Sequence, residues 1–136
     1  MAITKNLEIK INGEEANFSE KFYIYQNDRG IELNIKVVIP NLQIGRRYSS
    51  LLRDLNDAMC KATIQKPNKE IICKDNGIIS NDMIIFTIDH ELTDDLDEVG
   101  FYKIQFHIYD SENNRITIPP VEFEVKSLIG VTPDTI

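Results

Sequence analysis

Tryptophan is absent from the 136-residue sequence, and cysteine and histidine occur only twice each. With these residues in unrelated segments, the ligand spacing of a zinc site is missing. No apolar run approaches the roughly 20 residues that cross a bilayer, and the first five residues lack the pattern of a secretory signal. We therefore expect a chain made and folded in a cytoplasm, with no membrane contact and no cofactor.

Basic residues are in deficit, with 15 Lys and Arg against 22 Asp and Glu, which gives a net charge of -7. A negative surface opposes contact with phosphate backbones, because that binding requires a cationic surface that displaces counterions. Arg46 and Arg47 are the only adjacent arginines, and two solvated loop charges are a better interpretation than an anion site. Nucleic acid is therefore not an expected partner.

Catalytic patterns are also scarce. His90 stands between Asp89 and Glu91, but neighbours along a strand point to opposite faces and cannot readily share a proton. The acids between residues 94 and 98 lack the ligand spacing and central glycine of a calcium loop, and fit the first turn of a helix instead. The sequence predicts no catalytic or metal site, and hence no enzyme.

Whether Cys60 and Cys73 can form a disulfide depends on the register of the two strands that carry them. If residues 66–69 form a four-residue turn, Cys60 faces Asp75 and Cys73 faces Ala62, so the two sulfurs are diagonal neighbours on one face. Diagonal positions lie roughly 7 to 8 Å apart at the backbone, beyond the usual reach of a disulfide. This register predicts two buried free thiols.

What the sequence does contain is alternation of apolar and polar residues, the two-residue period of half-buried strands. It is clearest in residues 100–126, where a polar turn and the pair Pro119-Pro120 interrupt it; the prolines mark an edge, a bulge or a step between sheets. About eight or nine strands are predicted, at residues 7–11, 22–25, 31–39, 60–65, 70–73, 83–88, 102–108, 116–118 and 121–125. An all-β fold, an antiparallel two-sheet β-sandwich, follows.

The segments between the strands give further expectations. Turns are predicted at Asn12-Gly13 and at residues 26–30, and residues 14–20 are expected to be irregular. Residues 75–77 lie between the expected hairpin and the next strand. Residues 83–88 are apolar on both faces, as in a strand that is covered on both sides or lies at a subunit contact.

Helical structure is expected in two places at most. Thr93 can cap a single turn that Gly100 ends. Ser49 or Ser50 can cap a short helix, although a looping connection fits residues 41–57 nearly as well. Residues 1–126 are interpreted as one domain, and residues 127–136, which lose the alternation, as a linker toward a following segment.

Several motifs, in this order and spacing, resemble a known family. They are residues 26–35 (QNDRGIELNI), 52–55 (LRDL), 62–69 (ATIQKPNK), Leu92 and Thr93 followed by 99–102 (VGFY), 106–110 (FHIYD) and 119–128 (PPVEFEVKSL). The sequence from residue 22 to residue 128 thereby resembles the N-terminal domain of phage baseplate upper proteins, from siphophages and prophages of Gram-positive bacteria. The longer stretch at residues 42–50 departs from the family pattern.

The resemblance implies an immunoglobulin-like sandwich that docks a receptor-binding arm onto the central hub of the phage tail. The implied partners are the distal tail hub protein, a receptor-binding protein reached through a following C-terminal part, and further copies of this chain, for example in a trimer. The implied location is the virion tail tip, after assembly in the bacterial host cytoplasm. The family has no catalytic residues to carry over.

Tyrosine is the best residue-level guide to a protein interface, because it combines a large apolar area with a polar end. The candidate interface comprises Tyr23, Tyr25, Arg46, Arg47 and Tyr48. Edge strands are expected near Pro119-Pro120 and at residues 7–11. The competing function is a cell-surface or secreted β-sandwich module that binds glycan or protein; a sandwich-fold hydrolase is weaker, because no suitably spaced acid pair stands out.

Overall fold

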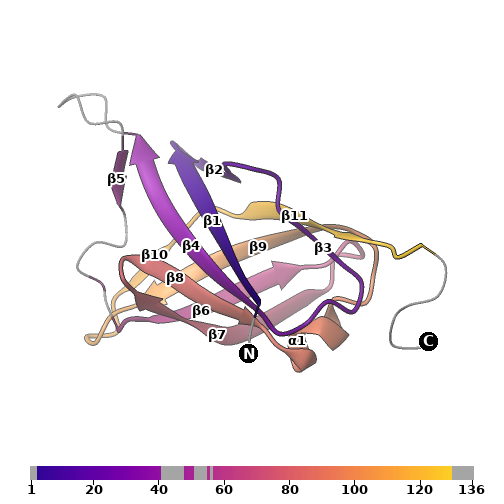
Figure 1. Cartoon of the computed structure of the whole chain (residues 1–136). Coiled ribbons are helices and arrows are strands. Elements are labelled where there is room, and N and C mark those ends of the chain that lie inside the picture. Colours follow the sequence, from indigo (N-terminus) through magenta and orange to yellow (C-terminus); the bar gives the residue numbers. More distant parts are fainter. Residues whose placement is uncertain (1–2, 41–47, 51–54, 56, 130–136) are drawn as a thin grey trace.

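A computed structural model describes residues 3–40, 48–50, 55 and 57–129, with the backbone alone at residues 40 and 48–50. The described residues form eleven strands and one short helix (Figure 1). Their bounds are β1 Ile3–Asn12, β2 Glu15–Phe18, β3 Tyr23–Tyr25, β4 Ile31–Pro40, β5 Tyr48–Ser50, β6 Met59–Gln65, β7 Ile71–Ser80, β8 Met83–Ile88, α1 His90–Asp95, β9 Gly100–Tyr109, β10 Arg115–Thr117 and β11 Val121–Lys126.

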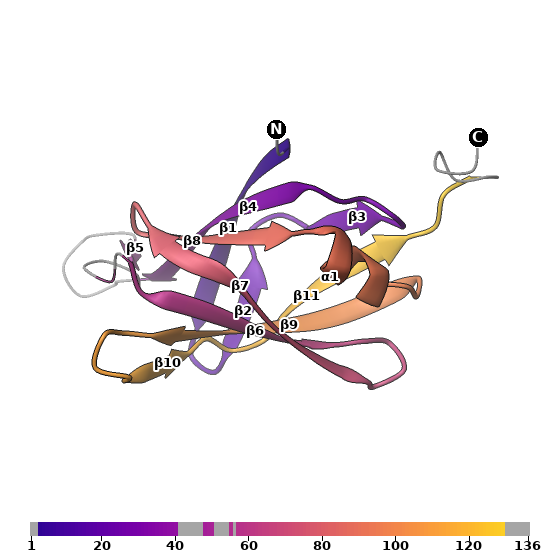
Figure 2. The same ribbon diagram turned by 90° about the horizontal axis from the view of Figure 1, so that it is seen from below.

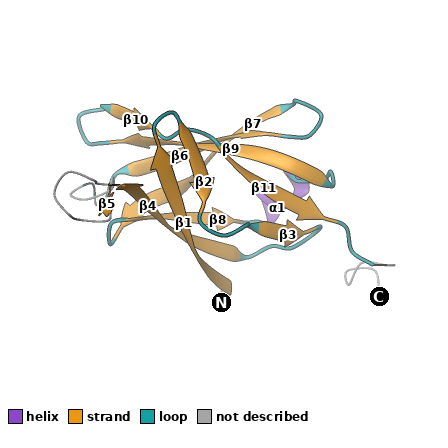
Figure 3. Ribbon diagram, turned by 90° about the horizontal axis from the view of Figure 1, so that it is seen from above, coloured by secondary structure: helices purple, strands orange, loops and turns teal. Residues whose placement is uncertain are grey.

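The strands belong to one hydrogen-bonded sheet in the order β2-β1-β4-β8-β7-β6-β9-β11-β3, with β5 beside β4 and β10 beside β9. The sheet curls back on itself, so that β1 and β2 cross over β6 and β9 (Figures 1 and 3). Phe86 of β8 and Phe106 of β9 meet across the interior, with ring centroids 5.6 Å apart. The mostly-β prediction is confirmed, but the two facing layers are parts of one curled sheet.

The join between the layers is β7, which lies between β8 and β6 (Figure 2). All of its pairing with β6 is antiparallel, and its last four residues, Gly77 to Ser80, also pair with β8. Antiparallel pairing dominates as expected, yet β1 pairs with β4 in parallel, and β3 with β11 in parallel. Alternation along a strand sets which face is buried but carries no information on the direction of its neighbour, so these two parallel pairs could not be predicted.

The predicted central strand is confirmed as β4, which lies between β1 and β8. Its inward side chains Ile31, Leu33, Ile35 and Val37 are buried. The predicted edge at residues 7–11 is wrong, because β1 has β2 on its other side. Gly13, with φ of 66°, makes the turn that returns residues 15–18 as β2, in a segment expected to be irregular.

Residues 75–77, expected from the sequence to lie between the hairpin and the next strand, do not lie outside the strands. These residues continue β7, and the chain reverses instead at Asn81 and Asp82, whose φ values of 52° and 60° suit a two-residue hairpin. Gly77 serves a different purpose there. A Cβ on Gly77 would lie 2.9 Å from the Cβ of Cys60 and 3.0 Å from its carbonyl oxygen, so only glycine fits this close approach.

The β6–β7 hairpin closes over five residues, because Gln65 pairs with Ile71 and the backbone N–H of Lys66 donates to the carbonyl of Glu70. Cys73 therefore pairs with Thr63, and a shift of one residue turns a side chain to the other face. Cys60 is buried and Cys73 is exposed, both as free thiols. The prediction of a buried thiol is confirmed for Cys60 and wrong for Cys73.

Helix α1 begins four residues earlier than predicted. Asp89 is the N-cap and accepts a hydrogen bond of 2.8 Å from the backbone N–H of Leu92. Thr93, the predicted cap, is buried and donates to the carbonyl of Asp28 at 2.7 Å. The helix ends at Leu96, and Gly100, the predicted terminator, begins β9.

A buried lysine ties the segment after α1 to the β6–β7 hairpin. Lys66 Nζ lies 2.7 Å from a carboxylate oxygen of Asp97 and 3.2 Å from one of Glu70, and these contacts raise the pKa of the lysine. The hydroxyl of Tyr102 donates to the carbonyl of Glu98 at 2.7 Å. The start of β9 is thereby held in place.

Further sequence predictions concern the proline pair, β8 and the segment that contains residues 48–50. Pro119-Pro120 separates β10 from β11, which pair with different parts of β9, so the predicted interruption is confirmed. In β8 the inward side chains are buried and the alternate ones half-buried. Residues 48–50 are in β5, and the rest of the stretch for which a short helix was predicted lies largely outside the described residues.

Candidate functional site

Two of the five predicted interface residues lie together on β3, at one end of the sheet. The side chains of Tyr23 and Tyr25 are 41% and 39% exposed, and their rings meet edge to face with centroids 5.8 Å apart. Arg46 and Arg47 lie outside the described residues, and of Tyr48 only the backbone in β5 is described. The structure therefore brings together the tyrosine pair alone.

A third ring extends this pair across the sheet. In the register of β9, β11 and β3, Phe101 and Tyr23 both pair with Glu124 and thus flank it, while Lys126 pairs with Tyr25. Phe101 is 58% exposed. We call the five side chains of Tyr23, Tyr25, Phe101, Glu124 and Lys126 the aromatic surface.

Phe101 is absent from the predicted interface, although the sequence carries a signal for it. The alternation in β9 turns the even-numbered residues from Tyr102 to Ile108 inward, and all of these are buried. Phe101 is odd-numbered, so its side chain lies on the outer face of β9 together with those of Lys103, Gln105 and His107. A large apolar residue on a polar face is the pattern of a contact site.

Charges lie close to the rings of the aromatic surface. Lys126 Nζ is 4.1 Å from the centroid of the Tyr23 ring, within the range of a cation–π interaction. A hollow of about 220 Å³ lies among these rings and charged side chains. It is lined by Lys21, Phe22, Tyr23, Phe101, Glu122, Phe123, Glu124 and Lys126. Exposed rings with interleaved charges of both signs suit a protein partner better than a polyanion.

The outer edge of β3 is closed at Tyr25. The backbone N–H of Tyr25 donates to the carboxylate of Asp28 at 3.0 Å, and the N–H of Asp28 donates back to the carbonyl of Tyr25 at 3.1 Å. An edge whose backbone groups are already bonded is a poor template for another strand. Contact at this site therefore relies on side chains.

Buried rings support the aromatic surface from below. Tyr102 stacks on Phe123 at 5.3 Å with an interplanar angle of 19°, and Phe22 lies 5.8 Å from Phe123. The hydroxyl of Tyr102 is fixed by Glu98. Because the supporting rings are packed and hydrogen-bonded, little order has to be gained on binding.

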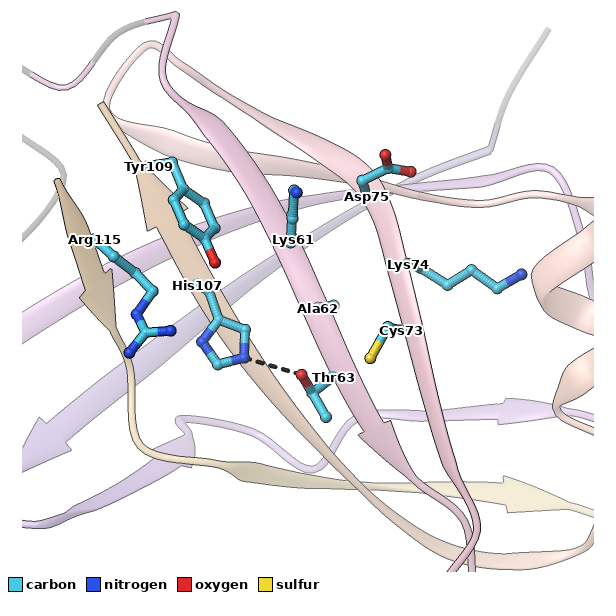
Figure 4. Close-up of a pocket in the computed structure, with 9 residues that line it drawn as sticks. All are labelled: Lys61, Ala62, Thr63, Cys73, Lys74, Asp75, His107, Tyr109 and Arg115. Carbon is cyan, nitrogen blue, oxygen red and sulfur yellow. Dashed lines mark hydrogen bonds between the residues drawn. The ribbon is translucent and has the colours of Figure 1, made fainter. Parts of the chain in front are cut away.

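A second hollow, of about 450 Å³, lies on the outer face of β6, β7, β9 and β10 (Figure 4). Here the ring nitrogens of His107 lie 2.9 Å from the hydroxyl of Thr63 and 3.0 Å from that of Thr117. Burial, and then the nearby charge of Arg115, lower the pKa of His107. The lowered pKa favours the neutral imidazole, and each ring nitrogen is engaged by a hydroxyl.

The other histidine is also away from any acid–base arrangement. His90 opens α1 and is exposed, so the expected surface role fits its position, although the helix replaces the strand assumed for it. Across the described residues, no three His, Cys, Asp or Glu side chains gather in a way that could hold a metal ion. Within the same part of the chain, α1 is the one helix, and no helix has the length and apolar content to span a membrane.

No family model matches the sequence, and the search of curated proteins gives no match. Among solved structures, the fold is similar to the N-terminal domain of phage TP901-1 ORF48, with a TM-score of 0.53 and 10% sequence identity. The similarity covers 92% of this chain and 98% of that chain. The expected resemblance to the N-terminal domain of a phage protein is thus confirmed at the level of the fold.

Proposed function

We propose that the chain is a structural component of a phage tail baseplate, where it docks a receptor-binding arm to the central tail hub. The observation that carries the proposal is the fold similarity, which spans nearly all of both chains, to the N-terminal domain of a phage protein. The motifs between residues 22 and 128 resemble the N-terminal domain of phage baseplate upper proteins, which supports the same role.

The curled sheet is further proposed to be a variant of the immunoglobulin-like fold. The order β1-β4-β8-β7 followed by β6-β9-β11 corresponds to strands A-B-E-D and C-F-G of that fold, joined here through β7. Tyr102, near the start of the F-equivalent strand, bonds the backbone of Glu98 upstream, as in the tyrosine corner of those domains. The parallel direction of the β1–β4 pair departs from this pattern, in which A and B are antiparallel, and β3 beside β11 is an addition to it.

The proposed role requires no catalysis. His107 is held by two threonine hydroxyls rather than by a carboxylate, which supports a structural rather than a general-base role. An assembly subunit needs a rigid fold, a protected sheet edge and a preorganised contact surface, and this sheet has an edge closed at Tyr25 and the aromatic surface.

Docking is assigned to the aromatic surface. Complete burial of a phenylalanine side chain contributes about 1.5 to 3 kcal/mol, so covering two half-exposed rings should contribute about 2 kcal/mol, or roughly a 30-fold change in affinity. The charges of Glu124 and Lys126 beside the rings would fix the orientation of the partner.

The proposed partners are the tail hub protein and further copies of this chain, with a receptor-binding protein reached through a part that follows residue 136. The proposed location is the virion tail tip, after assembly in the cytoplasm of the bacterial host. Residues 127–136 would act as the departure point of the arm, since β11 ends at Lys126.

Co-expression of the tagged chain with the proteins of neighbouring tail genes tests the proposal. The wild-type chain is expected to co-purify with a hub protein, and the double variant Phe101→Ser/Tyr23→Ser to lose that complex. A matched control replaces two exposed apolar residues of β7 with serine, Ile71 and Ile78, which are 54% and 46% exposed.

Circular dichroism and thermal unfolding would verify that both double variants remain folded. Equal loss of the complex in the β7 control would remove the aromatic surface as the docking site. Failure of the wild type to bind any tail protein, together with measurable affinity for wall sugars, would replace the baseplate role by that of a glycan-binding module.

A further inference from the structure

The hollow on the outer face of β6, β7, β9 and β10 lies away from the aromatic surface. Tyr109, on its wall, is eight residues along β9 from Phe101, a separation of roughly 26 Å at the rise of an extended strand. Thr63 of β6 and His107 of β9 form the floor, and Arg115 of β10 forms the opposite wall from Cys73 (Figure 4). A partner at this hollow would leave the aromatic surface free.

The side chains on the floor of the hollow are held in position by contacts with one another. Thr63 and Thr117 hold the imidazole of His107 between them, at 2.9 and 3.0 Å. Lys61 Nζ lies 5.3 Å from the centroid of the Tyr109 ring, which holds this ammonium group over the hollow. Polar groups on three neighbouring strands are therefore fixed in position before any ligand arrives.

The charge of this hollow is opposite to that of the chain as a whole. In the described part of the chain, neither Lys61 nor Arg115 forms a salt bridge, while Lys74 turns away to Glu91 and Asp95 at 3.1 and 2.9 Å (Figure 4). Asp75 is the one carboxylate among the lining residues. Two cations without a salt-bridge partner in that part of the chain thus line this hollow beside a single carboxylate, in a protein of net charge -7.

We propose that this cationic groove, defined by Lys61, Thr63, His107, Tyr109 and Arg115, binds a carboxylate-bearing segment of a protein partner. Lys61 and Arg115 would engage side-chain carboxylates, and Arg115 can do so with two parallel N–H donors. The ring of Tyr109 lies between the cations, and the hydroxyl of Thr63 lies further along β6 (Figure 4). This ring and hydroxyl suit the backbone of an extended peptide. The groove is a second binding site, beyond the proposed docking to the hub.

The test measures binding of a fluorescein-labelled hexaglutamate peptide to the full chain by fluorescence anisotropy. The double variant Lys61→Gln/Arg115→Gln is expected to weaken binding at least tenfold. The matched control Lys36→Gln/Lys69→Gln removes the same net charge from exposed positions elsewhere and is expected to change affinity less than twofold. Hexaglutamine serves as the uncharged peptide control.

A chemical block gives a second readout without mutation. Cys73 lines the groove and is exposed, whereas Cys60 is buried, so a bulky maleimide should modify Cys73 alone and abolish hexaglutamate binding. Absence of wild-type binding at millimolar peptide, or equal losses in the two double variants, would overturn the proposal. Tighter binding of an oligogalacturonate of equal charge would overturn it in favour of an acidic glycan.

Discussion

Replacing Gly77 by alanine is expected to destabilise the fold by about 2 kcal/mol. The added Cβ would meet the Cβ of Cys60 at 2.9 Å, the carbonyl oxygen of Cys60 at 3.0 Å and a ring carbon of Phe86 at 3.3 Å. Two of these contacts involve strand backbone or the first side-chain atom, which cannot rotate away. Inserting one methyl group into such a packed site costs about 1 to 3 kcal/mol.

Thermal unfolding followed by circular dichroism measures this loss. For a domain of this size, 2 kcal/mol corresponds to a fall in Tm of roughly 8 °C. Guanidinium unfolding at fixed temperature should show the same loss as a lower midpoint with an unchanged slope.

Gly30 provides the matched control, because it has a φ of +69° and no atom lies within 4 Å of the position that a Cβ would occupy. Gly30→Ala should cost about 1 kcal/mol from left-handed backbone strain, and Gly30→Asn less, since asparagine tolerates that conformation. At Gly77 the cause is steric, so asparagine should be at least as harmful as alanine. An unchanged Tm for Gly77→Ala would refute the close approach of β7 to β6.

Three further predictions concern titratable and reactive groups. An aromatic disulfide reagent should react with one thiol in the folded chain and two in the unfolded chain, because Cys73 is exposed while burial raises the pKa of Cys60 to about 12; two unreactive thiols would contradict the observed register. Stability should fall as the pH drops below 6.5, because the folded-state pKa of His107 is lowered and the unfolded chain takes up the proton first, and the fall should be smaller in His107→Gln. Asp97→Asn should lower the urea midpoint more than Lys66→Met, because the first change leaves a buried ammonium group with fewer partners whereas the second removes it. The reverse order would argue against the ion pair between the buried Lys66 and the exposed Asp97.

The buried half of the fold was largely predictable from sequence. Alternation located β4, β6, β9 and β11 to within one or two residues, because a strand with one face in the core must place apolar side chains on every second position. The same parity places Phe101 on the outer face of β9. The tyrosines at positions 23 and 25 were predictable as a pair for the same reason.

Register and strand direction were not predictable. A hairpin loop of five residues rather than four turned Cys73 from the core to the surface, and nothing in the local sequence distinguishes the two lengths. Asn76-Gly77 has the composition of a turn, but tertiary packing against Cys60 uses the glycine inside a strand. The cationic groove depends on three strands in register, so no single segment could reveal it.

The proposed function makes this domain a structural component of a phage tail. Gold-labelled antibodies against the domain, applied to phage particles released from a lysed host culture and viewed by electron microscopy, test it most directly. The account predicts label concentrated at the tail tip. Label on the host cell surface, with none on the particles, would contradict it.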